Sequence, residues 1–198
     1  MKKKKSIYLR DETDFDKFVR KLPFYNSFLF RNVSFEVLGN NFNMKDEIVR
    51  VLNIKNRREK LRYIVDAGCN YIDDFFGEKN ICGFKNCKCY VQRKNKSEFY
   101  NGCCRKCIYQ SSKGCTTKNV ACKLFFCSEV KCRNTVITFD DINLFKCLTF
   151  RQKYILKNDY FSKVEDVTTD LYFNSLIIGF ARLFFRTLFN YFKFKSKN

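Results

Sequence analysis

A chain of 198 residues that is 45% hydrophobic and 18% aromatic has enough apolar material for a packed core, which excludes a chain disordered away from its two ends. Its single proline and seven glycines favour long helices over the many tight turns of a β-sandwich. A net charge of +19 is compatible with a nucleic-acid partner, although the bias toward Lys, Asn, Ile, Phe and Tyr is explained better by AT-rich codons.

The first elements follow from apolar spacing. Residues 7–9 are expected to form a short edge strand. From Thr13 the spacing becomes helical, and the apolar face of this helix consists of Phe15, Phe18, Val19 and Leu22. Pro23 is expected to end or kink it.

Three more helices are expected before residue 69. The second covers about residues 24–38 and ends at Gly39. The third is capped by Asn43 and buries Ile48, Val49, Val51 and Leu52. The fourth covers about residues 57–67 and stops at Gly68. Residues 1–68 are therefore predicted to be an N-terminal helical region.

Helical periodicity fails over residues 69–134, which are predicted to form an irregular, cysteine-rich, metal-binding module. Residues 135–198 are predicted to be a C-terminal helical region. In it, Asp140 is expected to cap a helix over residues 142–148, a segment over 149–156 follows, and Ser162 opens a long amphipathic helix reaching about Phe194. The predicted fold class is mainly α, with the module inserted between N- and C-terminal helices.

The crowding of cysteine is the strongest chemical signal. Ten of the twelve cysteines lie between Cys82 and Cys132, and the chain has no histidine. Three groups follow one another: Cys82-x4-Cys87-x-Cys89, Cys103-Cys104-x2-Cys107 and Cys115-x6-Cys122-x4-Cys127-x4-Cys132. Cys104-x2-Cys107 is a CxxC pair, whose thiolates can reach one metal from a tight turn. Any zinc site here is built from thiolates, either alone or together with a carboxylate.

The predicted metal ligands are ranked by this spacing. The centre of one or two sites is expected to comprise Cys103, Cys104, Cys107 and Cys115; Cys87, Cys89, Cys122 and Cys127 come next, followed by Cys82. Cys69, Cys132 and Cys147 are expected to be small buried apolar residues instead. Zinc is the favoured metal. An iron–sulfur cluster is the alternative, although the ferredoxin spacing is absent, and redox-active or disulfide-bonded thiols are the third possibility.

The run Gly102-Cys-Cys-Arg-Lys-Cys107, Gly114-Cys115 and Cys122-Lys-Leu-Phe-Phe-Cys127 resembles the bacterial CxxCxxCC family of zinc- or iron-chelating proteins. The Arg-Pro of that family's last motif is missing here. The resemblance covers residues 102–127 and implies metal chelation by these cysteines. The chain as a whole also resembles cysteine-rich proteins of low-GC anaerobic bacteria that have no assigned activity, so neither resemblance implies a reaction.

Catalytic motifs are missing from the sequence. Without histidine, neither a Ser-His-Asp nor a Cys-His nucleophile system can be built, and no Gly-rich phosphate loop is present. Asp73 and Asp74 are able to supply oxygen ligands or a general base, but a helix-start or solvated acidic pair explains them better; Glu129 has the same ambiguity. The sequence therefore favours a protein that is not an enzyme.

The final helix predicts a contact surface. Residues 171–192 are rich in Leu, Ile and Phe, and Arg182 and Arg186 lie in a polar stripe. Each central arginine costs about +2.5 to +3.5 kcal/mol in a bilayer, so spanning is disfavoured. Arg182, Arg186, Lys193 and Lys195 are the residues expected to contact an anionic membrane surface or a partner protein. Packing of its wide apolar face on the scaffold or on a second copy of the chain is the competing interpretation.

The expected location is the cytoplasm, with peripheral attachment to the inner membrane surface as a possibility. The lysine-rich start lacks an apolar segment because Asp11, Glu12 and Asp14 follow, so no secretory signal is expected. Thiols of a cytoplasmic protein stay reduced, which favours metal over disulfides. Two alternatives remain open: a thiol or iron–sulfur redox protein, and a nucleic-acid module that uses Tyr63 and Tyr90 beside basic residues.

Overall fold

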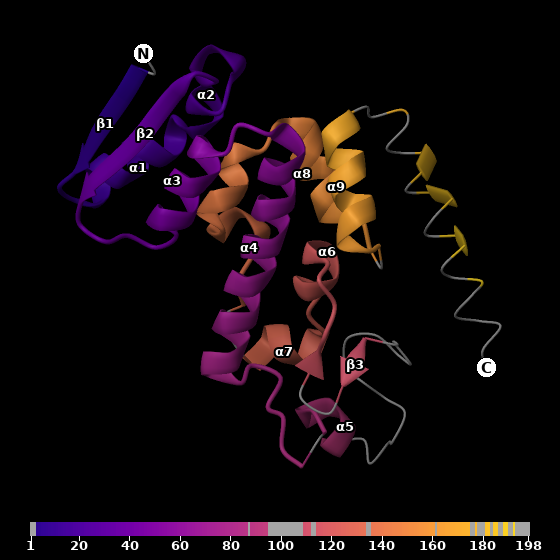
Figure 1. The fold of residues 1–198 in the computed structure, drawn as a ribbon. Helices are drawn as coiled ribbons and strands as arrows, with labels where there is room; N and C mark the ends of the chain where they lie inside the picture. The colour runs from indigo at the N-terminus through magenta and orange to yellow at the C-terminus, as the bar shows by residue number, and fades with distance from the viewer. Residues whose placement is uncertain are drawn as a thin grey trace.

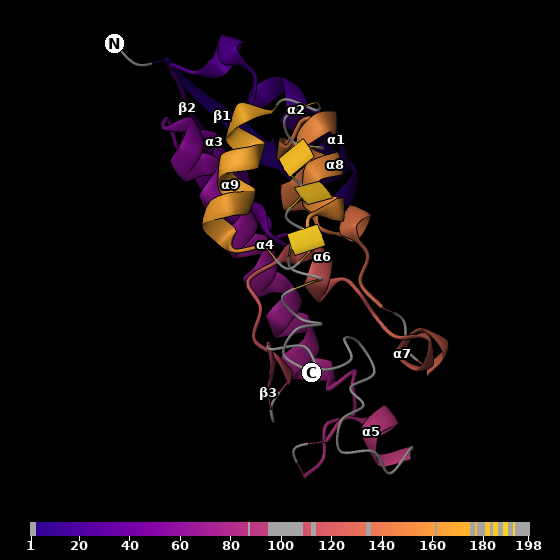
Figure 2. The ribbon, with the colours of Figure 1, turned by 90° about the vertical axis from the view of Figure 1, so that its right-hand side faces the viewer.

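The computed structural model describes residues 3–86, 88–94, 109–111, 114–133, 136–160 and 162–174, and from the last part of the chain residues 177, 181–182, 184–185, 188–189 and 192. These residues are mostly helical, with a small two-stranded parallel sheet, which confirms the mainly α prediction. A long helix, α4 (Arg57–Lys79), runs along the molecule (Figure 1). The N-terminal elements lie at one end of α4, and α5 and α7 lie at the other end, as both views show (Figure 2).

The N-terminal elements form a β-α-β unit. Strand β1 (Lys3–Leu9) pairs in parallel with β2 (Val33–Gly39), and Lys3 is in register with Val33. Between the strands lie α1 (Glu12–Arg20), α2 (Leu22–Tyr25) and the 3₁₀ helix η1 (Phe28–Phe30). The side chain of Asp11 caps α1, which buries Phe15, Phe18 and Val19. Both the strand and the first helix are confirmed, although the strand is longer than predicted.

The helix predicted over residues 24–38 is wrong. Pro23 lies in the first turn of α2, where its missing N–H costs nothing, instead of ending the preceding helix. Residues 33–39 form β2 because their backbone pairs with β1. The Asn53 side chain adds two hydrogen bonds of 2.8 Å each, accepting from the Phe35 N–H and donating to the Phe35 carbonyl. These contacts between distant residues override the local helical spacing.

Helix α3 (Lys45–Asn53) confirms the third predicted helix, with Ile48, Val51 and Leu52 buried. The predicted cap is wrong. Met44, in a left-handed conformation with φ 61°, precedes the helix, and Asn43 donates its amide to the Tyr71 hydroxyl at 2.6 Å instead. Asn43 therefore ties α3 to α4.

Helix α4 begins as predicted but does not stop at Gly68. Asn56 caps it by accepting from the N–H groups of Arg58 and Glu59, and the helix continues to Lys79. Gly68 lies against the ring of Phe145; a Cβ at this position would be 2.5 Å from two ring carbons. Gly68 therefore allows the Phe145 ring to pack closely against α4, and the helix continues past this residue. The helix thus crosses residue 69 into the predicted module.

Replacing Gly68 with alanine is expected to lower the free energy of unfolding by about 1–2 kcal/mol, because the new methyl group overpacks the buried Phe145 ring. Gly77 is a matched control in the same helix. Nothing lies within 4 Å of a Cβ at Gly77, so Gly77→Ala is expected to raise the free energy of unfolding by up to about 1 kcal/mol through helix propensity. Urea denaturation of both variants measures the difference. Equal effects of the two substitutions would contradict the packing.

The C-terminal elements complete the scaffold around the N-terminal part of α4, at the top of the view in Figure 1. They are two 3₁₀ helices, η2 (Phe139–Asp141) and η3 (Asn143–Cys147), followed by α8 (Phe150–Asn158) and α9 (Val164–Phe173). The helix predicted over residues 142–148 is present as the 3₁₀ helix η3. Its predicted cap is wrong, because Thr138 with Asp141, rather than Asp140, forms a capping box, and this box belongs to η2. Residues 139–148 supply several buried side chains: Phe139, Ile142, Leu144, Phe145, Cys147 and Leu148.

The final helix is also shorter than predicted. Helix α9 begins at Val164 rather than Ser162, and it ends at Phe173 because Asn174 adopts a left-handed conformation with φ 51°. The Ser162 hydroxyl donates to the Asp159 carboxylate within the loop before α9. Beyond Asn174, the residues that the structure describes, from Ile177 to Phe192, are again helical.

The predicted cysteine-rich region contains short regular elements. They are α5 (Tyr90–Lys94), the antiparallel pair β3 (Gln110–Ser111) and β4 (Gly114–Cys115), α6 (Val120–Lys123) and α7 (Ser128–Arg133). Val120 of α6, Val130 of α7 and Phe126 between these helices belong to the same core cluster as the scaffold. The Phe126 ring stacks on Phe76 of α4 at 5.1 Å between centroids. This region is therefore anchored on the C-terminal part of α4, near Phe76.

Candidate metal centre

The turn after α4 carries the first cysteine group. Asn80 ends α4 in a left-handed conformation with φ 39°, and its side chain accepts from the Phe84 N–H at 2.9 Å and donates to the Phe84 carbonyl at 3.2 Å. Lys85 and Lys88 then exchange two backbone hydrogen bonds of 3.0 and 3.1 Å, so the chain reverses within two residues. These two residues are Asn86, with φ 51°, and Cys87, which lies outside the described residues.

The reversal brings the two ends of this cysteine group together. The N–H of Tyr90, directly after Cys89, donates to the Cys82 carbonyl at 3.0 Å, whereas an extended chain would separate Cys82 and Cys89 by roughly 24 Å. The Arg93 guanidinium joins the two arms of the loop by donating to the carbonyls of Gly83 at 2.6 Å and Lys88 at 2.7 Å. Cys89 is buried and Cys82 is half-buried. Polar contacts thus hold two predicted ligands on one small loop.

Helices α5 and α7 bring a second cysteine-bearing segment to this loop. Lys94 of α5 forms an ion pair with Glu129 of α7 at 2.6 Å, and the Arg133 guanidinium lies 3.7 Å from the centroid of the Tyr90 ring. Cys127 directly precedes α7, and Cys132 lies within it. Glu129 is therefore an ion-pair partner of Lys94 and joins α7 to α5.

Helix α6 carries Cys122 and is fixed by Asn119. The Asn119 side chain is buried; its oxygen accepts from the Cys122 N–H at 2.9 Å, and its amide donates to the carbonyls of Asp159 at 2.6 Å and Ser162 at 3.3 Å. This one side chain caps α6 and bonds it to the loop between α8 and α9. Cys122 is buried as a result.

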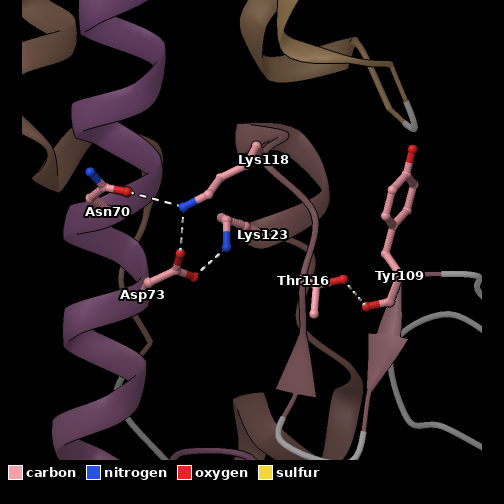
Figure 3. A network of polar contacts seen from close by, with 6 residues as sticks. All are labelled: Asn70, Asp73, Tyr109, Thr116, Lys118 and Lys123. Carbon is pink, nitrogen blue, oxygen red and sulfur yellow. Dashed lines mark hydrogen bonds and ion pairs between the residues drawn. The ribbon is translucent and has the colours of Figure 1, made fainter.

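A lysine–aspartate network joins α6 to α4 (Figure 3). Lys123, at the end of α6, has a side chain only 3% exposed and donates to one oxygen of Asp73. Lys118 donates to the other Asp73 oxygen at 3.5 Å and to Asn70 at 3.1 Å. Beside this network, Thr116 bonds the Tyr109 carbonyl through its N–H at 2.8 Å and its hydroxyl at 3.0 Å. Asp73 thus lies in the middle of α4 as a docking residue, not at a helix start.

Four of the nine predicted ligands are described with their side chains: Cys82, Cys89, Cys122 and Cys127. The others, Cys87, Cys103, Cys104, Cys107 and the side chain of Cys115, lie outside the described residues. Within the described part of the chain, no three cysteine, aspartate or glutamate side chains lie close enough together to hold a metal ion. The ligand set therefore stays a prediction.

The predicted non-ligands divide into two kinds. Cys69 and Cys147 are buried free thiols of the scaffold, as expected. Cys132 is exposed on α7, so its explanation as a small buried residue is wrong. Burial raises the pKa of the Cys69 thiol to about 12, and burial likewise raises the pKa of the Cys147 thiol to about 12. Neither thiol is therefore activated as a nucleophile.

These two thiols predict a loss of stability at alkaline pH. Their folded-state pKa lies above the ordinary value of 9.0, so their contribution is complete below about pH 9 and is lost as the pH rises toward 12. Each thiol is expected to contribute a slope of about 1.4 kcal/mol per pH unit in that interval. Urea denaturation at a series of pH values measures this slope. The Cys69→Ala/Cys147→Ala variant is expected to show a shallower slope, and an unchanged slope would contradict the assignment.

A polar cleft between α3 and α4 was missed by the sequence patterns. Its volume is about 390 Å³, and it is lined by Asn43, Met44, Glu47, Arg50, Tyr63, Asp66, Ala67, Asn70, Tyr71 and Asp74. Partial burial raises the pKa of Asp66, against the opposing effect of Arg62. The i, i+3 and i, i+4 spacing of Tyr63, Asp66, Ala67, Asn70, Tyr71 and Asp74 is the signal that could have placed them on one face of a helix.

The aromatic residues considered for base stacking lie under arginines of the same molecule. The Arg50 guanidinium is 4.7 Å from the centroid of the Tyr63 ring, and Arg133 covers Tyr90. One face of each ring is therefore occupied by an intramolecular cation–π contact.

Of the residues predicted to contact a membrane or a partner, the structure describes Arg182. Its Nε lies 3.1 Å from Oδ1 of Asp170 on α9. Arg186, Lys193 and Lys195 lie outside the described residues. The described part of the chain contains no helix with the length and hydropathy to cross a bilayer.

No family model, no curated protein and no solved structure matches the chain.

Proposed function

We propose that this protein binds a metal ion through thiolates of its cysteine-rich region, and that zinc is the metal. The observation that carries the proposal is the tight loop after α4, which holds Cys82 and Cys89 close together and places Cys87 in sequence between its paired lysines. Closely spaced cysteines on a tight turn are the usual way in which a small module presents thiolates to zinc.

The weak apolar content of the loop supports a structural role for the metal. Between residues 80 and 94, the buried apolar residues that the structure describes are Ile81, Cys89 and Val91. Polar hydrogen bonds from Asn80 and Arg93 provide most of the other contacts. A loop with so little core gains stability from metal ligation, since binding to the folded form alone adds directly to the folding free energy.

Cysteine spacing, rather than ligand chemistry, favours zinc over the iron–sulfur alternative. The chain has no histidine, so a nitrogen-rich zinc site cannot be formed. A cluster of iron and sulfide would use the same thiolates, but zinc needs no ferredoxin-type spacing and is redox-silent. The proposed role is therefore to hold the loop, α6 and α7 in one arrangement on α4.

Removing the metal with a chelator tests this role by amide hydrogen exchange. The amides of Lys85, Lys88 and Tyr90 are expected to lose protection by at least about tenfold, because their hydrogen bonds depend on the closed loop. The first turns of α4, around Leu61 and Ile64, are buried in the scaffold and provide the internal control. Unchanged exchange at the loop, with all thiols titratable before chelation, would contradict the proposal.

A further inference from the structure

Strand β1 is held by β2 along one of its two edges. The Asn53 side chain bonds the N–H and C=O of Phe35 at 2.8 Å each, so the backbone groups of Phe35 point away from β1. The Leu9 carbonyl of β1 accepts from the N–H of Asn40, directly after β2, at 3.0 Å. Successive residues of a strand direct these groups to opposite sides, so Leu9 and every second residue before it bond β2.

The residues between these, Lys4, Ser6 and Tyr8, form the outer edge of β1, because their N–H and C=O groups point away from β2. All three residues are exposed, and no group in the part of the chain that the structure describes bonds their N–H or C=O. Strand β1 lies at the outer side of the N-terminal unit, with β2 on its inner side (Figure 1). A row of unpaired backbone groups of this kind is a template for a further strand.

The lysines of β1 do not select an acidic strand as the partner. Lys4 already forms an ion pair with Glu36 of β2 at 2.9 Å. On the other face of the sheet, the Lys5 ammonium lies 4.6 Å from the centroid of the Tyr25 ring and 5.1 Å from that of Phe30. Both charges are engaged within the molecule, so recognition of the outer edge depends on its backbone groups.

The sequence of β1 is complementary to itself in the antiparallel direction. With Ser6 on a two-fold axis, Lys4 of one copy lies opposite Tyr8 of the other, and residues paired in this way exchange both N–H···O bonds. Lys3 and Lys5 then lie opposite apolar residues of the second copy, so no lysine directly faces a lysine. Two-fold symmetry, which brings the same patch of both copies together, is the commonest symmetry of protein dimers.

We propose that two copies of this chain pair through the outer edges of β1, which joins their sheets into one sheet of order β2-β1-β1-β2. The pairing satisfies the outward N–H and C=O groups of both copies. It also places the Tyr8 ring, which is 66% exposed, beside Lys4 of the second copy. The net charge of +19 on each copy opposes association, and salt screens this repulsion over a Debye length of about 10 Å at 0.1 M. The dimer is therefore expected to strengthen as ionic strength rises.

Analytical ultracentrifugation of the full chain, under reducing conditions and over a series of concentrations, tests this pairing. Ser6→Pro is expected to weaken dimerisation by at least about tenfold, because proline removes the N–H at the centre of the interface. The pairing of β1 with β2 is expected to survive, since the Ser6 N–H points away from β2. Ser6→Ala keeps this N–H and is the matched control, which is expected to dimerise like the parent.

Ser6→Lys distinguishes self-pairing from the addition of a strand by another protein. It changes an exposed side chain and places two lysines opposite each other at the axis, so it is expected to weaken the dimer even if circular dichroism shows that Ser6→Pro is unfolded. Three results would overturn the proposal. They are a parent chain that stays monomeric at high salt, a dimer that salt dissociates, and a dimer that a folded Ser6→Pro or Ser6→Lys variant leaves intact.

Discussion

Replacing Asp73 with alanine is expected to lower the free energy of unfolding by about 3 kcal/mol. The substitution removes the carboxylate that accepts from Lys123, whose side chain is 3% exposed, and leaves a buried ammonium group without its partner. The expected cost is at the low end for a broken buried ion pair, because Asp73 itself is 41% exposed and partly solvated. Urea denaturation, followed by far-UV circular dichroism, measures the change.

Lys118 provides the matched control, since it contacts the same carboxylate from a side chain that is 55% exposed. Lys118→Met is expected to change stability by less than about 0.5 kcal/mol, as for other surface ion pairs. Replacing both partners of this ion pair, as Asp73→Leu/Lys123→Met, is expected to recover most of the loss because no charge then remains buried. Equal costs for Asp73→Ala and Lys118→Met would show that α6 does not dock through Lys123.

Replacing Cys89 with serine is expected to lower the affinity for zinc by at least about a hundredfold. Loss of second-shell partners alone costs metal sites about 10–100-fold, and Cys89 is proposed as a direct ligand. Its thiol is buried at the base of the loop, next to the bond between Tyr90 and Cys82. Competition with a chromophoric zinc chelator measures the affinity of the variant relative to the parent.

Cys147 is the control for this experiment. It is also a buried free thiol, but it lies in η3 among scaffold residues, where burial raises its pKa to about 12. Cys147→Ser is expected to lower stability by about 1–3 kcal/mol through the buried hydroxyl while leaving the zinc affinity unchanged. If both variants keep the parental affinity, Cys89 is not a ligand; if both lose it equally, the effect is on folding.

Sequence patterns predicted the helices whose apolar faces are local, and missed those decided by distant contacts. Helices α1 and α3 were predicted because Phe15, Phe18 and Val19, and then Ile48, Val51 and Leu52, recur at helical spacing. Strand β2 was missed because its backbone partners are in β1 and its cap is the Asn53 side chain. Pairing of this kind is invisible to a pattern read along one segment.

Glycine and asparagine caused the other errors in helix length. Glycine is common at helix ends, but Gly68 lies within α4, where its missing side chain leaves room for the ring of Phe145, a residue 77 positions later in the sequence. Asn174 ends α9 in the left-handed conformation, although the apolar spacing continues through it. Glycine therefore does not end a helix where a tertiary contact requires it, as at Gly68. Apolar periodicity does not continue a helix where one residue adopts the left-handed conformation, as at Asn174.

The thiolate chemistry of the candidate site stays a prediction from cysteine crowding and missing histidine, whereas its arrangement was not predictable at all. The structure adds a tight loop in which the Tyr90 N–H, directly after Cys89, bonds the Cys82 carbonyl. The contacts that anchor this region, from Lys123 to Asp73 and from Asn119 to the loop before α9, come from residues without a motif. Lysine, aspartate and asparagine side chains of this kind have no sequence signature, so their contacts are recognised only in the folded structure.

Metal content is the most direct test of thiolate ligation. The full chain, purified without oxygen, is expected to contain zinc in a stoichiometric amount and to show no visible absorption. Titration with a thiol reagent is expected to find fewer reactive cysteines before chelation than after it. A broad visible absorption with bound iron would replace zinc by an iron–sulfur cluster. A protein with neither metal, whose cysteine-rich region is equally reactive with and without chelator, would contradict metal binding.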